Sequence, residues 1–342
     1  MPDSTSERPL VSFTIKAYDQ ESLIAEAVAG AFAQTWSPLE IILSDDGSPD
    51  GTFRVMQELA AAYTGPHRVV LNRNPKNLGI AGHMNRLARL VSARLWVDSA
   101  GDDISEPQRV ARLVAAWQSG GGRVKAVHSS FTEIDEAGRP VRTGGPSRVI
   151  LDAPGPDPLT IVTTGANGVG ATALWDMELF DRFGPIPDGC KVQDGVLFFR
   201  AALLDGIAYL DEPLIRYRLG GISRKKPRSP GYDYLYGDRL KFDGWRLGNV
   251  RAFLADMERV ADFPGKAEAR AFCERYAARA GFEVALASRG ALGRIAAVPG
   301  ALVRSLSARD GFFGRQALKH ALGPVYVAYY NARTRPNSTA VS

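Results

Sequence analysis

The stretch that decides the fold reads LVSFTIKA at residues 10–17, and the run LEIIL follows at residues 39–43. Both runs are short and apolar, which is typical of buried β-strands. Between them, residues 21–34 carry apolar side chains at helical spacing. The alternation continues with a helical run at 50–63, a strand at 69–71, a helical run at 79–92 and a strand at 95–97. Strands that alternate with helices in this way predict right-handed βαβ units and a parallel sheet.

Pairs of acidic residues follow two of these strands. Asp45 and Asp46 come directly after residues 39–43, and Asp102 and Asp103 come shortly after the later strand. Ligands bind at the carboxyl ends of the strands in such sheets, so we expect the four carboxylates at one edge. Gathered negative charges repel unless a divalent cation or hydrogen-bond donors offset them. Mg²⁺ or Mn²⁺ suits these oxygen ligands and completes its shell with phosphates, which points to a nucleotide diphosphate. The alternative for each pair is a solvated turn.

The alternation changes beyond residue 124. Extended runs are predicted at 124–134 and 140–141, strand and helix at 171–175 and 176–182, a helix at 194–204, and strands near 208–210 and 214–218. From residue 232 to about residue 330 the pattern is mainly helical. A helical extension is therefore expected after the sheet.

The composition limits the class of protein. The 342 residues are 45% hydrophobic and 23% charged, which is ordinary for a globular chain and excludes a disordered or collagen-like one. No run of 18 apolar residues occurs, so a transmembrane helix is not expected. The polar start, MPDSTSERPL, does not resemble a secretory signal. With Cys190 and Cys273 as the two cysteines, neither a disulfide framework nor a cysteine metal cluster is expected, and the predicted location is the cytoplasm.

The net charge of +5 conceals an uneven distribution. Residues 1–212 hold 19 Lys and Arg against 27 Asp and Glu, whereas residues 213–342 hold 23 against 10. The basic part includes an amphipathic stretch from Leu292 to Leu306, with aromatic residues after it. Such a stretch can lie on an anionic membrane surface; the alternative is a helical appendage packed on the rest of the chain. Nucleic-acid binding would explain the charge but not the acidic strand ends, and no nucleic-acid partner is expected.

A series of short motifs resembles the family 2 glycosyltransferases. The motifs are VSFTIKAYD (11–19), QTW (34–36), EII (40–42), DDGSPDGT (45–52), NLGI (77–80), GDDI (101–104) with Pro107, GAT (170–172), FG (183–184), QD (193–194) and YR (217–218). The resemblance covers roughly residues 9–223. It implies a GT-A fold and the transfer of a sugar from a nucleotide donor with inversion at the anomeric carbon.

The resemblance also implies roles for the donor-binding residues. Tyr18 matches the position whose ring stacks on the nucleotide base, a contact worth about 1–3 kcal/mol; alternatively, Tyr18 covers the edge of the core. Asp46 matches the residue that accepts a hydrogen bond from the uracil imide in uridine-dependent relatives. Its neighbour Asp45 is expected to orient the loop of the nucleotide-sugar site.

Asp102 and Asp103 match the metal- and ribose-binding acids written D-x-D in many relatives, with Ala100 in place of the first acid. Relatives often carry a metal-ligating His where this chain has Gly220, so the shell of the Mg²⁺ or Mn²⁺ would depend on Asp103, phosphates and water.

The catalytic base is expected on a helix later in the chain. Asp194 matches the general base that takes the proton of the acceptor hydroxyl, and Gln193 stands where relatives usually carry Glu. The alternative is that Asp194 only caps the following helix.

Other polar residues give weaker signals. His83 and Asn85 fall near the expected donor phosphates, although lone polar residues on a helix are usually solvated. Arg218 and the basic run 224–226 are interpreted either as screening the diphosphate or as a solvated loop. Cys190 has no His and Asp partners that would suit thiol catalysis.

The sequence therefore predicts an α/β protein with a GT-A type, Rossmann-like mixed sheet flanked by helices and a helical C-terminal extension. The catalytic domain is expected over residues 9–223, divided into a nucleotide-sugar half at 9–130 and an acceptor half at 131–223. A basic, mainly helical extension is expected over 224–335 and a disordered tail over 336–342.

The expected function is metal-dependent, inverting transfer from a UDP-, dTDP- or GDP-linked sugar to a glycan or lipid-linked acceptor. The expected setting is cell-envelope polysaccharide or glycan synthesis, in the cytoplasm or at the inner face of the membrane. Two alternatives remain. A nucleotidyltransferase would need a basic, glycine-rich loop after the first strand, where residues 18–21 read YDQE. A non-catalytic nucleotide-sugar-binding relative would fit the departures at Ala100, Gln193 and Gly220.

Overall fold

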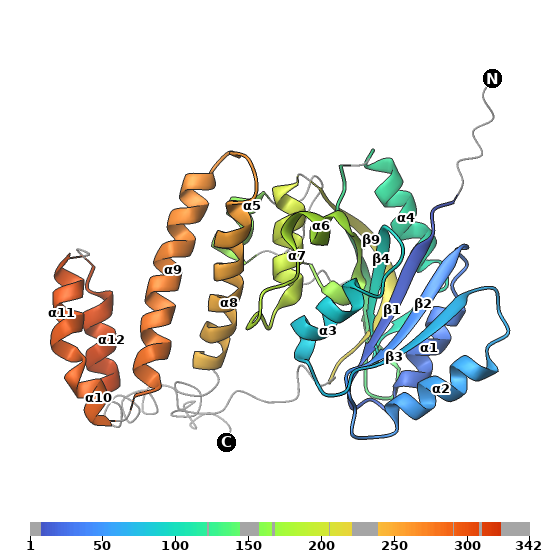
Figure 1. The fold of residues 1–342 in the computed structure, drawn as a ribbon, viewed down its shortest axis with the longest axis horizontal. Coiled ribbons are helices and arrows are strands. Elements are labelled where there is room, and N and C mark those ends of the chain that lie inside the picture. Colours follow the sequence, from blue (N-terminus) through green and yellow to red (C-terminus); the bar gives the residue numbers. More distant parts are fainter. Residues whose placement is uncertain are drawn as a thin grey trace, which may run out of the picture.

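Helices cover both faces of a central mixed sheet (Figure 1). The computed structural model describes residues 8–121, 123–143, 157–165, 168–204, 206–220, 239–289, 291–307 and 310–322. The basic run at 224–226, the aromatic residues beyond 322 and the tail predicted at 336–342 lie outside these ranges.

Nine strands within the described residues form one sheet. They are β1 (Val11–Ala17), β2 (Leu39–Asp45), β3 (Arg68–Arg73), β4 (Leu95–Ala100), β5 (Ile104–Ser105), β6 (Ala126–Ile134), β7 (Pro140–Thr143), β8 (Ala173–Asp176) and β9 (Ile207–Arg218). The order is β3-β2-β1-β4-β8-β6-β9-β5, and β7 pairs with β6. The strands β3, β2, β1 and β4 are parallel, whereas β8 runs antiparallel to β4 and β6. The mixed sheet predicted from the sequence is confirmed.

The helices of the first two-thirds of the described chain flank this sheet. They are α1 (Ile24–Phe32), α2 (Thr52–Ala62), α3 (Gly79–Ala88), α4 (Arg109–Ser119), α5 (Pro158–Thr164), α6 (Glu178–Phe183) and α7 (Gln193–Leu203), with a 3-10 turn, η1 (Gly170–Thr172), before β8. Residues of α1, α2 and α4 pack with Val11, Phe13 and Ile15 of β1 in one hydrophobic cluster. Residues of α3, α6 and α7 belong to a second cluster, which contains Trp96 and Trp175. Side chains of β4 therefore pack into both clusters, whereas those of β1 belong to the first cluster.

The two short strands predicted near 208–210 and 214–218 are one strand, β9. Its pairing with β6 steps from Leu210 opposite Ser129 to Pro213 opposite Ser130, so two residues of β9 bulge out of the ladder. Proline has no backbone N–H to donate, which is the physical reason for the local break. The strand continues to Arg218 and thereby reaches the edge where β4 ends.

The C-terminal helices are α8 (Arg239–Met257), α9 (Lys266–Ala287), α10 (Ala291–Ala296), α11 (Val298–Ser307) and α12 (Phe312–Ala321). Figure 1 shows α8 beside α7, followed by α9 and then by α10, α11 and α12. Phe253 and Met257 of α8 and Cys273 of α9 share the hydrophobic cluster of α7. A separate small cluster joins α9 to α11 and α12. The predicted helical extension is confirmed, and within the described ranges no helix is both long and apolar enough to cross a membrane.

Candidate active site

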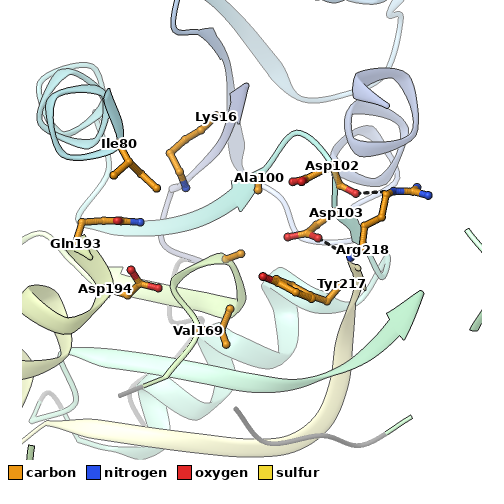
Figure 2. A pocket seen from close by; sticks show the side chains of 11 residues that line it. Lys16, Ile80, Ala100, Asp102, Asp103, Val169, Gln193, Asp194, Tyr217 and Arg218 are labelled. Carbon is orange, nitrogen blue, oxygen red and sulfur yellow. Dashed lines mark hydrogen bonds between the residues drawn. The ribbon is translucent and has the colours of Figure 1, made fainter. Parts of the chain in front are cut away.

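A pocket opens at the carboxyl ends of β1 and β4 (Figure 2). It is lined by Lys16, Ile80, Ala100, Asp102, Asp103, Val169, Ala171, Gln193, Asp194, Tyr217 and Arg218. Asp102 and Asp103 lie on one side of the pocket and Asp194 on the other, as Figure 2 shows. The structure thus brings together three of the predicted site residues from distant parts of the chain. Tyr18, Asp45 and Asp46 are not among the lining residues.

Arg218, the last residue of β9, holds the Asp102–Asp103 turn in place. Its backbone N–H donates to Asp103 Oδ1 at 2.9 Å, and its Nε donates to the carbonyl of Asp102 at 3.0 Å. The rest of the guanidinium donates to the carbonyls of Asp135 and Glu136 and to Glu26 Oε2. Arg218 is buried, so its side chain does not form a solvated loop but fixes the acidic turn.

Burial changes the protonation of the two acidic side chains. Asp103 is 2% exposed, and burial together with the neighbouring Asp102 raises the pKa of Asp103 to about 8. Burial also raises the pKa of Asp102. Two carboxylates held this closely in a half-buried pocket need a compensating positive charge before both can ionise.

The two carboxylates fit a divalent cation that takes its other ligands from a substrate. Mg²⁺ and Mn²⁺ prefer oxygen ligands and are commonly held by one or two carboxylates plus phosphates and water. Because residue 100 is alanine, this edge offers no third acid, and the described residues contain no group of three or more His, Cys, Asp or Glu placed to hold a metal. Asp102 and Asp103 would therefore hold such an ion only together with a bound diphosphate.

Asp194 lies in the first turn of α7 and faces the pocket. The cap position of α7 is Val192, so the alternative that Asp194 caps this helix is wrong. Instead, Asp194 Oδ2 accepts a hydrogen bond of 3.0 Å from the backbone N–H of Gly170 in η1. A side chain at residue 170 would lie 3.2 Å from the Asp194 carboxyl group, so glycine allows this close approach. The preceding residue, Gln193, is buried, and within the described part of the chain its Oε1 has no hydrogen-bond partner.

Tyr18 and Asp46 lie in the loops after β1 and β2, and Asp45 is the last residue of β2. Asp45 accepts hydrogen bonds from the backbone N–H of Ser48, at 3.1 Å, and from the Ser48 hydroxyl. The same hydroxyl accepts from the backbone N–H of Asp19, at 3.0 Å, so Asp45 links the two loops. Asp19 has a positive φ of 55°, which turns the chain sharply after the half-buried Tyr18.

The carboxylate of Asp46 forms hydrogen bonds within the protein. It accepts hydrogen bonds from the backbone N–H groups of Leu78 and Gly79 and from the amide of Asn74. Asp46 is 4% exposed, and burial raises its pKa. These contacts tie the end of β2 to the start of α3; the contacts of Tyr18 and Asp46 with a nucleotide base stay predictions.

Two charged residues at or beneath the floor of the pocket, Lys16 and Arg109, were not found from the sequence. Lys16 on β1 forms an ion pair with Asp98 on β4. Arg109 on α4 is fully buried and donates to the carbonyls of Asp98 and Ala171, at 2.8 and 2.7 Å. The signal available for Lys16 was a charged side chain within a run that forms a buried strand, where lysine is uncommon.

The expectation of a solvated His83 is wrong. His83 is 3% exposed, and its Nε2 lies 2.7 Å from the hydroxyl of Ser44. Burial, followed by the positive charge of Lys16, lowers the pKa of His83 to about 3. Asn85 bridges to both the N–H and the carbonyl of Ile186. Both side chains therefore attach α3 to other parts of the fold, at Ser44 and at Ile186.

Comparison with solved structures identifies the class of the fold. TarS 1-349 of S. aureus in complex with UDP-GlcNAc superimposes with a TM-score of 0.57 at 13% identity, and the match covers 92% of both chains. The mannosyltransferase PcManGT of Pyrobaculum calidifontis, in complex with GDP-Man and Mn²⁺, gives a TM-score of 0.52 at 16% identity, covering 97% of this chain and 89% of that one. The fold is therefore of the GT-A type.

Sequence comparison gives a matching family model and several relatives. The model described as "Glycosyl transferase family 2" matches residues 12–151, so this part of the chain is similar to that family. The putative glycosyltransferase EpsE of Bacillus subtilis is 33% identical over 107 residues, which are 31% of this chain and 38% of EpsE. Chondroitin synthase of Escherichia coli is 31% identical over 136 residues, which are 40% of this chain and 19% of the synthase. The chain thus spans less than two-fifths of the length of either relative.

Proposed function

We propose that this chain transfers a sugar from a nucleotide-diphosphate sugar to an acceptor hydroxyl, with inversion, in polysaccharide or glycan synthesis. The observation that carries the proposal is the placement of Asp194 across one pocket from Asp102 and Asp103. The family, the names of the curated relatives and the nucleotide sugars bound by the structural neighbours support it. The donor would carry UDP, dTDP or GDP.

The two sides of the pocket would perform different parts of the reaction. Asp102 and Asp103 would hold Mg²⁺ or Mn²⁺ against the diphosphate, where the ion would neutralise the charge of the leaving group. Asp194 would accept the proton of the acceptor hydroxyl on the opposite side. Attack from the side opposite the departing diphosphate inverts the anomeric carbon. Tyr18 would stack on the base, and the loops joined by Asp45 and Asp46 would support the nucleotide.

Calorimetric titration with UDP-, dTDP- and GDP-sugars, with Mn²⁺ and with EDTA, tests this function. We expect one nucleotide to bind with Mn²⁺ and the bound sugar nucleotide to be hydrolysed slowly to free sugar and nucleoside diphosphate. Consumption of a nucleoside triphosphate with release of pyrophosphate would instead indicate a nucleotidyltransferase. Binding without any turnover would indicate a non-catalytic relative, and no binding of any nucleotide diphosphate would refute the proposal.

We also propose contact of the C-terminal helices with an anionic membrane at its inner face. Of the thirteen large hydrophobic side chains that are exposed in the described chain, seven lie within residues 291–322, in or directly after α10, α11 and α12; they are Leu292, Ile295, Leu302, Val303, Leu306, Leu318 and Leu322. On α12, at 100° per residue, Leu318 lies next to Arg315 and Lys319 on the side opposite the buried Phe313. Exposed apolar side chains flanked by basic ones suit the interface of an anionic bilayer.

A further inference from the structure

Lys16 places a positive charge at the floor of the pocket. It is the next-to-last residue of β1, and its side chain is 10% exposed. It lines the pocket together with Ala100, Asp102 and Asp103, and Figure 2 shows the ammonium group pointing into the space between these residues and Gln193. A lysine in this position is not explained by the apolar pattern of the strand.

The register of the sheet places Lys16 directly beside Ala100, the position of the first acid in the D-x-D motif. In the parallel ladder between β1 and β4, Lys16 pairs with Ala100, and Thr14 pairs with Asp98. Side chains two residues apart on a strand share a face, so all four lie on the same face of the sheet. Adjacent strands are about 4.8 Å apart, so an aspartate at residue 100 would be a neighbour of the ammonium group. The site therefore carries a methyl group where a third carboxylate would neutralise Lys16.

Asp98 fixes the ammonium group without using all of its donors. Asp98 is 1% exposed, and its Oδ1 accepts from Lys16 Nζ and, at 3.3 Å, from the hydroxyl of Thr14. A lysine ammonium group has three N–H donors. Among the residues that the structure describes, Asp98 accepts one of them, which leaves two donors on the nitrogen at the surface of the pocket.

We propose that Lys16 binds the diphosphate of the nucleotide donor. A third carboxylate at residue 100 would help to bind a metal ion, and the positive charge of Lys16 partly replaces the charge of that ion. This inference rests on the proposed function and names the residue that holds the leaving group. During transfer, the bond between the anomeric carbon and the β-phosphate oxygen breaks, and its electron pair stays on the phosphate. The acceptor oxygen forms the new bond, and its proton passes to Asp194. Lys16 donates hydrogen bonds to the phosphate oxygens as their negative charge grows.

Binding of nucleosides and nucleoside diphosphates by the full chain tests the inference without turnover. The probes are uridine and UDP, thymidine and dTDP, and guanosine and GDP, each pair titrated in EDTA and in Mn²⁺. We expect the wild type to bind the diphosphate more tightly than the nucleoside even in EDTA. Lys16→Met should weaken diphosphate binding about 10- to 100-fold, because it removes a hydrogen bond to a charged group, and should leave nucleoside binding unchanged. Lys16→Arg should retain most of the affinity.

Two further variants separate binding from folding. Lys16→Met leaves the carboxylate of Asp98 buried without its partner, so the double variant Lys16→Met/Asp98→Asn is measured as well, because it removes both charges. Ala100→Asp should bring in a competing carboxylate, so its diphosphate affinity should fall further when EDTA replaces Mn²⁺ than that of the wild type. Lys266→Met on α9, away from the pocket, is the control.

The outcomes distinguish this inference from the proposed function. If the wild type binds none of UDP, dTDP and GDP under any condition, the proposed function itself fails. If the wild type binds a diphosphate and the folded Lys16→Met/Asp98→Asn variant binds it equally well in EDTA, Lys16 is only a structural partner of Asp98 and the inference is overturned. Equal weakening of nucleoside and diphosphate binding would also overturn it.

Discussion

The carboxylate of Asp194 accepts a hydrogen bond of 3.0 Å from the backbone N–H of Gly170, which joins the first turn of α7 to the turn before β8. This bond directs one oxygen of Asp194 away from solvent and leaves the other for the pocket. An asparagine side chain has an oxygen that can accept the same bond, but it cannot take a proton from a hydroxyl group.

Asp194→Asn should therefore lower turnover by about 10²–10⁴-fold while donor affinity and melting temperature stay near those of the wild type. Turnover is measured as nucleoside diphosphate release, and donor affinity by calorimetry. The control is Asp188→Asn, which changes an exposed carboxylate in the loop before α7. A wild-type rate in Asp194→Asn would show that the carboxylate has only a structural role.

Metal binding should depend on pH through Asp103. Its pKa is raised to about 8 by burial and by Asp102, and a carboxylate must lose its proton to bind a metal. Below pH 8, binding of Mn²⁺ then displaces a proton, so the apparent affinity should rise by up to about tenfold per pH unit from pH 6 to 8 and level off above. Calorimetry of Mn²⁺ with saturating nucleotide measures this. Asp103→Asn should bind Mn²⁺ weakly at every pH.

The raised pKa of Asp103 also affects the stability of the metal-free protein. Between pH 4 and pH 8 the folded state retains the proton of Asp103, whereas the unfolded chain has lost it. The folded state therefore binds more protons, and this group makes the free energy of unfolding decrease as the pH rises through that range. Asp103→Asn should reduce the decrease in urea unfolding experiments. A Mn²⁺ affinity that does not change from pH 6 to 8 would contradict the assignment of Asp103 as a ligand.

The ion pair between Arg200 and Asp256 should be essential for the junction of α7 and α8. The two side chains are 0% and 1% exposed, and Arg200 Nε lies 2.8 Å from Asp256 Oδ2. Asp256→Ala should lower the free energy of unfolding by about 3–5 kcal/mol, because it leaves a buried guanidinium group without its partner. Urea unfolding measures the change.

An exposed ion pair provides the control for this effect. Glu212→Ala removes the partner of Arg112 at the surface and should change stability little, since water solvates the remaining charge. If Asp256→Ala is as stable as Glu212→Ala, the junction of α7 and α8 depends on the hydrophobic cluster alone.

Membrane contact should depend on Arg315 and Lys319. Co-sedimentation with anionic vesicles at low salt should recover the wild type, and neutral vesicles should not. Each basic residue near an anionic leaflet contributes about 1 kcal/mol, so the variant Arg315→Glu/Lys319→Glu should lose most of the binding. Salt should weaken the contact, because the Debye length falls from about 10 Å at 0.1 M to about 3 Å at 1 M.

Two further variants identify which part of the surface binds the membrane. Leu302→Ser/Leu306→Ser should lower any binding that persists at high salt, since these exposed side chains would insert into the bilayer. Arg54→Glu, an exposed residue of α2, should have no effect. If the wild type shows no preference for anionic vesicles at low salt, the helices α10 to α12 serve only as a packed appendage.

The local pattern of the chain predicted most of the sheet and the acidic residues around the pocket. Strands form at 11–17 and 39–45 because apolar side chains recur at every second residue, such as Val11, Phe13 and Ile15, and this pattern depends on neighbouring residues alone. The acids after β2 and β4 are recognisable because a strand end places them at the edge of a parallel sheet. The roles of Tyr18, Asp46 and Asp194 toward a substrate remain predictions.

Only the tertiary structure decided which of these residues act together. Arg218 is 115 residues from Asp103, and nothing local to β9 indicates that its backbone N–H meets that carboxylate. The burial of His83 and the pairing of Lys16 with Asp98 depend likewise on which helix covers the sheet and on the register of β1 and β4. Sequence by itself determines periodicity, and hence the elements and the faces they bury. Contacts between distant elements depend on the free energy of packing the whole chain, so the pKa of Asp103 and the surroundings of Lys16 follow only from the fold.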